Sequence, residues 1–319
     1  MTGHDDLGRI SDAFPHERSR SVADDFRVLQ DDITSGLERL EMNNAGKRFT
    51  EDIWVRPGGG GGRTRVLTEG AVWERGGVNF SEVMGETNEA LQNQLQSPAT
   101  QFWASGVSLV LHPRNPHVPI VHMNVRHFAL NDGTSWFGGG IDLTPHYIDV
   151  EEARSFHVTL KDICDAHNCA NYQEFKDQAD DYFFLPHRNE TRGVGGIFFD
   201  HLGRTCESVE DWRQIRAFVM DVGGGFLTSY LPLVHKKMER PYSAEQRDWQ
   251  LHRRGRYVEF NLVWDRGTRF GLESNGRTES ILMSLPPEAR WTYTPLPGPE
   301  EQKTLTLLRK GVPWVEGGN

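Results

Sequence analysis

The segment PIVHMNVRHF, residues 119–128, carries the side chains best suited to chemistry in this sequence. Side chains alternate between two faces of a strand, so His122, Asn124 and Arg126 would share one face. Histidine transfers protons near neutral pH, asparagine donates and accepts hydrogen bonds, and arginine binds a carboxylate through two parallel hydrogen bonds. This face therefore predicts a binding site for an organic acid, whereas His127 would lie on the opposite, mostly apolar face.

Two neighbouring segments extend the predicted site. GVSLVLHP places Ser108 and His112 on one strand face, and its short connection to the next strand predicts an antiparallel pair that brings His112 near His122. In WFGGGIDLTP, Asp142 follows the glycines at 138–140, and glycines inside a strand mark a bulge or the close approach of a flat ligand or another backbone. We expect Asp142 either to accept hydrogen bonds from ligand N–H groups or to cap a turn.

Four histidines offer a second kind of chemistry, because neutral imidazoles are good ligands for transition metals. They are His112, His122, His157 and His187. Their spacing resembles neither a zinc finger nor a His-Glu-x-x-His helix. The sequence therefore leaves two alternatives open: a metal site assembled by the fold, or separate structural roles.

An arginine-rich segment at residues 253–287 is the third candidate. Its runs at 256–265, 268–272 and 279–287 are bounded by Gly, Pro, Asn or Asp and predict strands, with Asp265 on the polar face of the first. The charge density favours a carboxylate-binding wall or a sheet-edge contact in a dimer over a solvated hairpin. Pairing among these charges remains an alternative.

The candidate residues need a sheet to hold them. Besides the three runs just named, strand-like runs lie at 106–113, 119–130, 135–145 and 195–202. Apolar residues at helical spacing mark 18–43, about 150–166, 171–183, 208–236 and 243–253. Because strands and helices do not alternate regularly, the sequence predicts an α+β fold: one domain over residues 1–319, with a large, mostly antiparallel sheet of six or seven strands flanked by helices.

Two segments are expected to be flexible. The five glycines at 58–62 resist ordering and predict a surface loop. A sharper hypothesis makes this loop a mobile lid, with Arg63 and Arg65 meeting an anion as it closes. Residues 1–17 predict a flexible N-terminus.

Composition narrows the class of protein. The net charge of −10 disfavours nucleic acids and anionic membranes as partners, so an anionic substrate must be held by local arginines. No apolar run approaches the roughly 18 residues of a membrane helix, and the first residues lack a signal-peptide pattern, so we expect a soluble, cytoplasmic protein. Three cysteines, Cys164, Cys169 and Cys206, argue against a disulfide framework.

Six motifs in order carry a family resemblance that spans about residues 20–314. Together they resemble the oxygen-dependent coproporphyrinogen III oxidases of haem biosynthesis. The motifs are GGVNFSEVMG, GVSLVLHPRNP, VHMNVRHF, WFGGGIDLTP, YFFLPHRNETRGVGGIFFD and RRGRYVEFNLVWDRGTRFGLESNGRTESILMSLPP.

The resemblance implies a homodimer of subunits built on a large antiparallel sheet. It implies that coproporphyrinogen III and O2 are the substrates, and that two propionates become vinyl groups with release of CO2 to give protoporphyrinogen IX. No organic cofactor is implied, and a divalent metal stays an open expectation. A base that removes a pyrrole proton would let the electron-rich ring react with oxygen directly.

The resemblance also assigns roles by position. The implied substrate contacts are Ser108, Asn124, Val125, Arg126, Asn275, Gly276 and Arg277. His122 takes the position of the proton donor, Asp142 and Asp265 those of acidic residues in binding or turnover, and residues 257–292 the dimer interface. Histidines 112, 122, 157 and 187 match proposed metal ligands. Because one residue cannot easily be both a metal ligand and a free proton donor, we favour the acid–base role for His122. Arg126 or Arg277 would bind a propionate, and Asp142 would accept hydrogen bonds from pyrrole N–H groups.

Two other classes of function stay in view. One is a tetrapyrrole carrier without turnover, against which the retention of His122, Arg126 and Asp142 speaks. The other is a metal-dependent oxygenase with an unrelated substrate, built on the four histidines. Metal analysis and an activity assay with a chelator distinguish the three.

Overall fold

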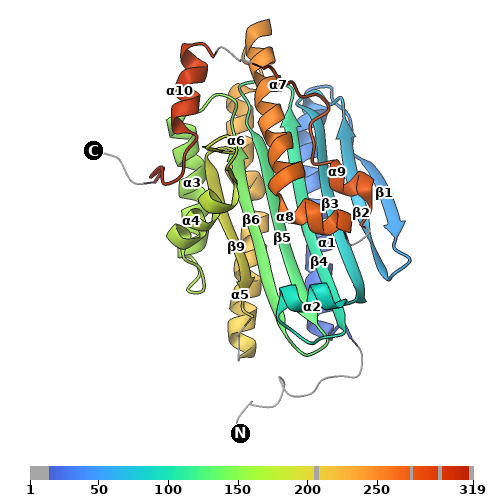
Figure 1. The fold of residues 1–319 in the computed structure, drawn as a ribbon. Coiled ribbons are helices and arrows are strands. Elements are labelled where there is room, and N and C mark those ends of the chain that lie inside the picture. Colours follow the sequence, from blue (N-terminus) through green and yellow to red (C-terminus); the bar gives the residue numbers. More distant parts are fainter. Residues whose placement is uncertain (1–13, 205–207, 274–275, 294–296, 316–319) are drawn as a thin grey trace.

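An antiparallel sheet of seven strands forms the centre of the molecule, in the order β1-β2-β3-β4-β5-β6-β9 (Figure 1). The structure, a computed structural model, describes residues 14–204, 208–273, 276–293 and 297–315. Each neighbouring pair of strands is antiparallel. The strands are β1 (Thr50–Val55), β2 (Gly60–Thr68), β3 (Trp73–Glu86), β4 (Gln101–Pro113), β5 (Ile120–Leu130), β6 (Ser135–Thr144) and β9 (Gly195–Leu202).

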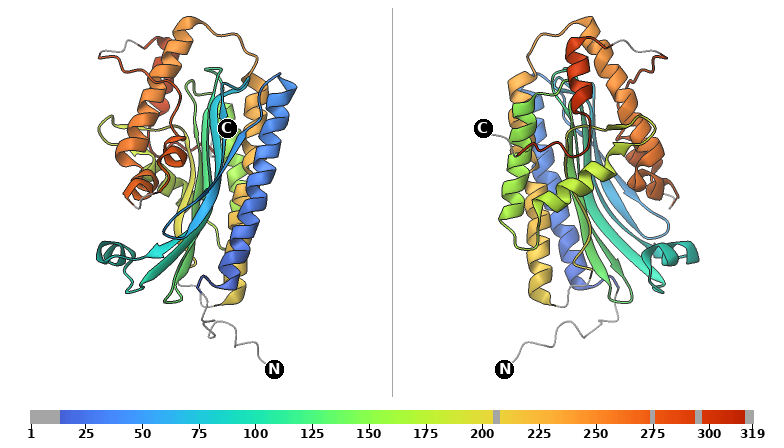
Figure 2. Two further views of the ribbon diagram at one scale, coloured as in Figure 1. Left: turned by 90° about the vertical axis from the view of Figure 1, so that its right-hand side faces the viewer. Right: turned by 60° about the vertical axis from the view of Figure 1, so that its left-hand side comes forward.

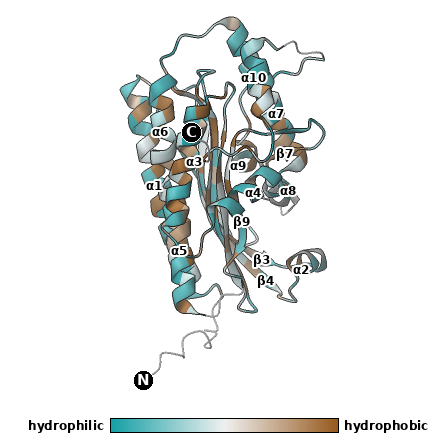
Figure 3. Ribbon diagram, turned by 90° about the vertical axis from the view of Figure 1, so that its left-hand side faces the viewer, coloured by the Kyte–Doolittle hydropathy of each residue, from teal (hydrophilic) through white to brown (hydrophobic). Residues whose placement is uncertain are grey.

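Helices cover one face of the sheet, which we call the core face. Along β5 the side chains of Val121, Met123 and Val125 are fully buried on this face. They join one apolar cluster with residues of the covering helices, where each buried aliphatic side chain contributes about 1.5–3 kcal/mol. Hydrophobic and hydrophilic residues mix along these helices, as expected of amphipathic elements (Figure 3). They are α1 (Glu17–Asn43), α3 (Val150–Asp165), α5 (Val209–Gly224) and α6 (Phe226–Lys237).

The opposite face, the polar face, is covered only in part. Two groups of helices project from it at opposite ends of the sheet, as Figure 2 (left) shows. One end carries α2 (Glu89–Leu95); the other carries α7 (Ala244–Glu259), the π-helix η1 (Phe260–Trp264), α8 (Arg266–Glu273) and α9 (Thr278–Leu282). The remaining elements are α4 (Tyr172–Tyr182), the two-stranded sheet of β7 (Phe184–Leu185) and β8 (Glu190–Thr191), and α10 (Pro299–Leu307).

The predicted α+β class and large antiparallel sheet are confirmed, but three predicted strands are wrong. The runs at 256–265 and 268–272 are helical, and 279–287 contains the end of α9 and a turn. The helix α7 begins with a capping box, in which Ser243 and Gln246 bond each other's backbone N–H groups. Residues 249–257 are all buried, so the helix has no polar stripe from which the sequence could reveal its period.

Three strands before residue 100, β1 to β3, were not predicted. The glycine run belongs to them: only Gly58 and Gly59 lie in the turn after β1, and β2 starts at Gly60. A Cβ on Gly61 would lie 2.3 Å from the carbonyl oxygen of Trp54, so glycine is needed here for close strand packing. The expectation that all five glycines form a loop is therefore wrong.

The lid hypothesis fails for a second reason. Arg63 and Arg65 point to the core face, where both form ion pairs with Asp31 of α1 at 2.8 and 2.7 Å. They lie on the opposite side of the sheet from His122 and Arg126, so they cannot meet a ligand on the polar face.

The predicted helix at 208–236 is divided at Gly225 into α5 and α6. Contrary to the expectation from the sequence, the stretch Val209–Lys237 is long and apolar enough to cross a membrane, by length and composition alone. Half of its most apolar window is buried inside the protein, where Phe218 and Val219 join the main core. It is therefore accounted for as a core helix.

Candidate active site

The strand register brings the predicted polar residues together on one face. His122 is directly opposite Asp142 on β6, and Asn124 is opposite Ser108 on β4. Arg126 is opposite Gly106 on one side and Gly138 on the other. Along β5 this face is partly exposed and the other is buried, which confirms the predicted alternation.

His122 is hydrogen-bonded to Asp142, whose ionised carboxylate accepts, with 2.8 Å between Nδ1 and Oδ1. The carboxylate of Asp142 also receives two hydrogen bonds from Arg192, from Nη2 at 2.6 Å and from Nε at 3.2 Å. The side chains of Asp142 and Arg192 are 1% and 2% exposed, whereas His122 is 22% exposed. His122 is thus the member of this triad that faces the open part of the polar face.

Charge compensation keeps the buried pair ionised. Burial alone would raise the pKa of Asp142, but Arg192 and the hydrogen bond from His122 outweigh it and lower that pKa. Burial alone would lower the pKa of Arg192, but Asp142 raises it. Because removing either partner would leave an uncompensated buried charge, the two side chains depend on each other.

The guanidinium of Arg126 lies next to Gly138 of the neighbouring strand β6. Its Nη1 donates to Asn124 Oδ1 at 2.8 Å, and its Nη2 pairs with Asp200 Oδ2 at 2.9 Å. A Cβ on Gly138 would lie 2.7 Å from the guanidinium carbon of Arg126 and 2.7 Å from Asp200 Oδ1. Glycine at 138 therefore makes room for an arginine side chain, which the sequence did not predict. The irregular register between Phe137 and Gly139 in the pairing of β6 with β9 agrees with the predicted bulge.

A second carboxylate lies beside His122. Asp265, which ends η1, accepts a hydrogen bond from the hydroxyl of Tyr182 at 2.7 Å and two from Thr268 at 2.7 Å. Burial would raise the pKa of Asp265, but the hydrogen bonds from Tyr182 and Thr268 and the nearby His122 lower it. Burial and Asp265 together raise the pKa of Tyr182, so this hydroxyl keeps its proton. The π-helix η1, an element often found at functional sites, delivers Asp265 to this position.

Other predicted contacts are placed less centrally. Val125 is buried on the core face, so its side chain cannot reach a ligand on the polar face. Arg277, just before α9, is ion-paired with Asp52 of β1, and Asn275 lies outside the described residues. The helix α9 is tied to the polar face of β3, where Asn79 donates to the carbonyl oxygen of Ser280 at 2.8 Å.

The four histidines do not converge. His157 lies in the helical layer, and its two ring nitrogens contact the hydroxyl of Tyr172 and the carbonyl oxygen of Val194, both at 2.9 Å. His187 contacts Glu259 and Trp264 with its ring nitrogens, at 2.8 and 3.0 Å.

His112 is fully buried on the polar face, and its Nε2 lies 2.8 Å from the carbonyl oxygen of Ser284. Burial holds the pKa of this imidazole well below its ordinary value. Among the described residues, no three His, Cys, Asp or Glu side chains are grouped to bind a metal. The set His112, His122, His157 and His187 therefore does not fit one shared metal site.

The sequence analysis missed Arg192, Asp200 and Tyr182. Asp200 could have been found, because in the predicted strand 195–202 it alternates onto the same face as Phe198. Arg192 gave no comparable signal: it follows a two-residue strand, and its partner Asp142 is 50 residues away in the sequence.

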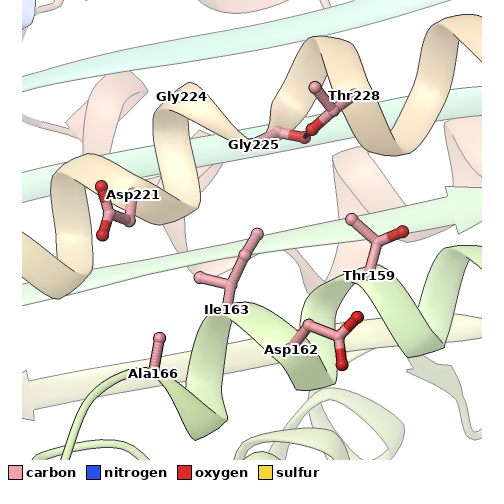
Figure 4. A pocket seen from close by; sticks show the side chains of 8 residues that line it. All are labelled: Thr159, Asp162, Ile163, Ala166, Asp221, Gly224, Gly225 and Thr228. Carbon is pink, nitrogen blue, oxygen red and sulfur yellow. Dashed lines mark hydrogen bonds between the residues drawn. The ribbon is translucent and has the colours of Figure 1, made fainter.

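A shallow depression outside this site is lined by Thr159, Asp162, Ile163, Ala166, Asp221, Gly224, Gly225 and Thr228 (Figure 4). It lies between α3 and the junction of α5 and α6, in the layer that covers the core face. No residue of the triad or of the Arg126 group lines it, so we place the candidate active site on the polar face.

Two comparisons with known proteins agree with each other. Residues 21–314 match the sequence profile of the family described as "Coproporphyrinogen III oxidase". The chain is 45% identical over 314 residues to a protein from Prochlorococcus marinus named "Oxygen-dependent coproporphyrinogen-III oxidase". That alignment covers 91% of this chain and 90% of the relative.

Proposed function

The chain belongs to the coproporphyrinogen III oxidase family, and from this premise we propose that its substrate binds on the polar face of β4, β5 and β6. The enzyme converts two propionate side chains of coproporphyrinogen III to vinyl groups, with O2 as the oxidant, and forms protoporphyrinogen IX and CO2.

The observation that best supports this proposal is the partly exposed Arg126 on the polar face, whose guanidinium is already oriented by two partners. Arg126 is 33% exposed, and two of its nitrogens already contact Asn124 and Asp200. A substrate propionate can take the place of the Asp200 carboxylate, since an arginine fork binds either carboxylate in the same geometry. Arg277, on the same side of the sheet, is the second cation that we assign to propionate binding, in exchange for Asp52.

His122 is the residue that we assign to proton transfer. Its Nδ1 is occupied by Asp142, which leaves Nε2 for the substrate or its intermediates. Asp142 is buried and bonded to Arg192, so it has no open side from which to meet pyrrole N–H groups. We assign that contact to Asp265 instead, because it is the partly exposed carboxylate beside His122.

The electron balance explains why proton delivery matters. Loss of CO2 and one β-hydrogen from each propionate releases an electron pair, and the pairs from both propionates reduce O2 to water when protons are supplied. We propose that the chain's own residues bind the substrate and move these protons, and that no organic cofactor takes part. No step is assigned to a metal, because the four histidines do not fit a shared site.

An activity assay tests the proposal. Purified protein is incubated with coproporphyrinogen III in air and under nitrogen, and protoporphyrin fluorescence is read after chemical oxidation of the product. We expect product only in air, a large loss of turnover in His122→Gln, and near-normal turnover in the control His127→Gln, since His127 lies on the core face. Equal turnover of the His122→Gln variant and the wild type would remove His122 from the mechanism, and a carrier would give no product at all.

We also propose that the chain forms a homodimer through residues 257–292. Support comes from large apolar side chains exposed in this segment: Leu262 is 48%, Val263 52% and Trp291 53% exposed. Exposed large apolar side chains are frequent at protein interfaces. Light scattering of the wild type and of Val263→Lys checks this, with a dimer expected for the first and a monomer for the second.

A cytoplasmic location is the last part of the proposal. The thiols of Cys164 and Cys169 are free, as is usual in a reducing compartment. Cell fractionation with an antibody against the chain tests it, and recovery in the membrane pellet would contradict it.

A further inference from the structure

We propose that Arg192 is a positioning residue of the reaction: it fixes Asp142 and thereby determines which ring nitrogen of His122 carries a proton. This inference rests on the proposed role of His122. It assigns Arg192 no contact with the substrate, and it gives a function to a buried arginine that the reaction chemistry alone would not require.

All three nitrogen groups of Arg192 are already used inside the protein. Nη2 and Nε donate to the two oxygens of Asp142, and Nη1 donates to Asn261 Oδ1 at 3.0 Å. The side chain is 2% exposed. A propionate therefore cannot reach this guanidinium without dismantling the site, so Arg192 acts through Asp142.

Aromatic rings hold the guanidinium in its plane. Its central carbon lies 4.3 Å from the ring centre of Phe183, 4.8 Å from that of Tyr257 and 4.7 Å from that of Phe260. These rings come from the loop before β7, from α7 and from η1, so several elements fix one side chain. A planar fork stacked on rings is a task for arginine, and lysine, a point charge on a flexible stem, cannot reproduce it.

The fixed carboxylate in turn orients His122. An ionised Asp142 accepts hydrogen bonds but cannot donate one, so the proton between it and His122 lies on Nδ1. The neutral imidazole then presents the lone pair of Nε2 to the polar face, and the protonated form presents an N–H there. Phe183, one of the three rings around Arg192, also contacts His122: the two ring centres are 6.1 Å apart in an edge-on arrangement.

The charged groups around His122 predict the direction in which loss of Arg192 changes proton binding by the His122–Asp142 pair. The titratable and charged groups near it are Asp142 from β6, Arg192 after β8, Asp265 after η1, Tyr182 from α4 and Arg126 four residues further along β5. Replacing Arg192 by a neutral residue removes a positive charge from this set. The His122–Asp142 pair then binds its proton more tightly, so the limb of the pH–rate profile that reports this pair moves to higher pH.

The test compares Arg192→Gln, Arg192→Lys and a matched control. Arg253→Gln is the control, because Arg253 is also buried, pairs with Glu190 at 2.9 Å and lies over a ring, that of Trp249, yet touches neither Asp142 nor His122. For Arg192→Gln we expect kcat to fall on the order of 100-fold, the lower end of what a positioned acid–base group contributes. We expect the limb of the pH–rate profile that reports the His122–Asp142 pair to move to higher pH by about one unit or more, because a nearby positive charge is lost. For Arg192→Lys we expect a similar fall in kcat with the limb in place, because the charge is kept and the fork is lost.

A ¹⁵N NMR titration of His122 provides a readout that needs no turnover. In the wild type we expect the neutral ring to carry its proton on Nδ1, and in Arg192→Gln we expect tighter proton binding and a mixture of tautomers. If the wild type makes no product but this difference appears, the proposed function fails, whereas the control of the His122 tautomer by Arg192 through Asp142 stands. If Arg192→Gln titrates like the wild type, or if it loses kcat only as much as Arg253→Gln with an unmoved limb, Arg192 is merely structural and the inference is overturned. Should Arg192→Gln not fold, a wild-type kcat in Arg192→Lys overturns it equally.

Discussion

Replacement of Arg126 by alanine is the sharpest single test of substrate binding. The variant loses a charge-assisted pair with a substrate carboxylate, and hydrogen bonds to charged groups contribute about 1.5–3 kcal/mol each. Arg126 is 33% exposed and must first give up Asp200, so we discount two such bonds to about 2–3 kcal/mol in total. At 1.4 kcal/mol per factor of ten, KM for coproporphyrinogen III should rise about 30- to 150-fold.

Gly138→Ala tests the same contact without removing the charge. Its Cβ would lie 2.7 Å from the Arg126 guanidinium carbon, so the arginine must move and KM should rise although every charge is kept. Arg216→Ala is the control, because Arg216 is similarly exposed and paired, with Asp25, in the helical layer. The assay is initial-rate formation of protoporphyrinogen in air across substrate concentrations. An unchanged KM in both Arg126→Ala and Gly138→Ala would refute the assignment of Arg126 to propionate binding.

Removal of divalent metals with a chelator should leave turnover at the untreated level in an aerobic assay, and a loss restored only by added metal would contradict the metal-free steps. Burial lowers the pKa of His127 to about 3, whereas the same side chain in the unfolded chain binds a proton below about pH 6.5. Protonation therefore favours the unfolded chain as pH falls from about 6.5 towards 3, and the free energy of unfolding decreases over that range. Between pH 6.5 and 5 this histidine should cost about 2 kcal/mol of unfolding free energy, measurable by urea denaturation, and His127→Gln should flatten the dependence. Finally, Val263→Lys should shift the protein from dimer to monomer in light scattering, whereas Val158→Lys, an exposed control on α3, should not.

The polar face was predictable because strand alternation is a local property of the sequence. Alternation along the strand alone predicted that His122, Asn124 and Arg126 share one face. The register of β4, β5 and β6 then places Ser108 and Asp142 beside them. The partners of Asp142 were not predictable, because Arg192 reaches it through tertiary packing across three rings.

The segment 256–287 shows the opposite case. Its alternating apolar and polar residues fit a strand, but α7 is buried on every side over residues 249–257, and its arginines pair with Glu74, Glu190 and Glu259. When buried arginines are compensated by carboxylates of other elements, as Arg253 and Arg254 are by Glu190 and Glu74, periodicity no longer indicates which side of an element faces the core. The strand β2 was missed for a different reason: the glycines at its start pack closely against β1, but in the sequence they look like the glycines of a flexible loop.

The most direct test of the account is the structure of the complex with coproporphyrinogen III, prepared without oxygen so that the substrate persists. The account predicts a propionate on the guanidinium of Arg126 in place of Asp200, the ring system over β4, β5 and β6, and Nε2 of His122 directed at the substrate. A tetrapyrrole bound elsewhere, for example in the depression between α3 and the α5–α6 junction, with Arg126 still paired to Asp200, would contradict it.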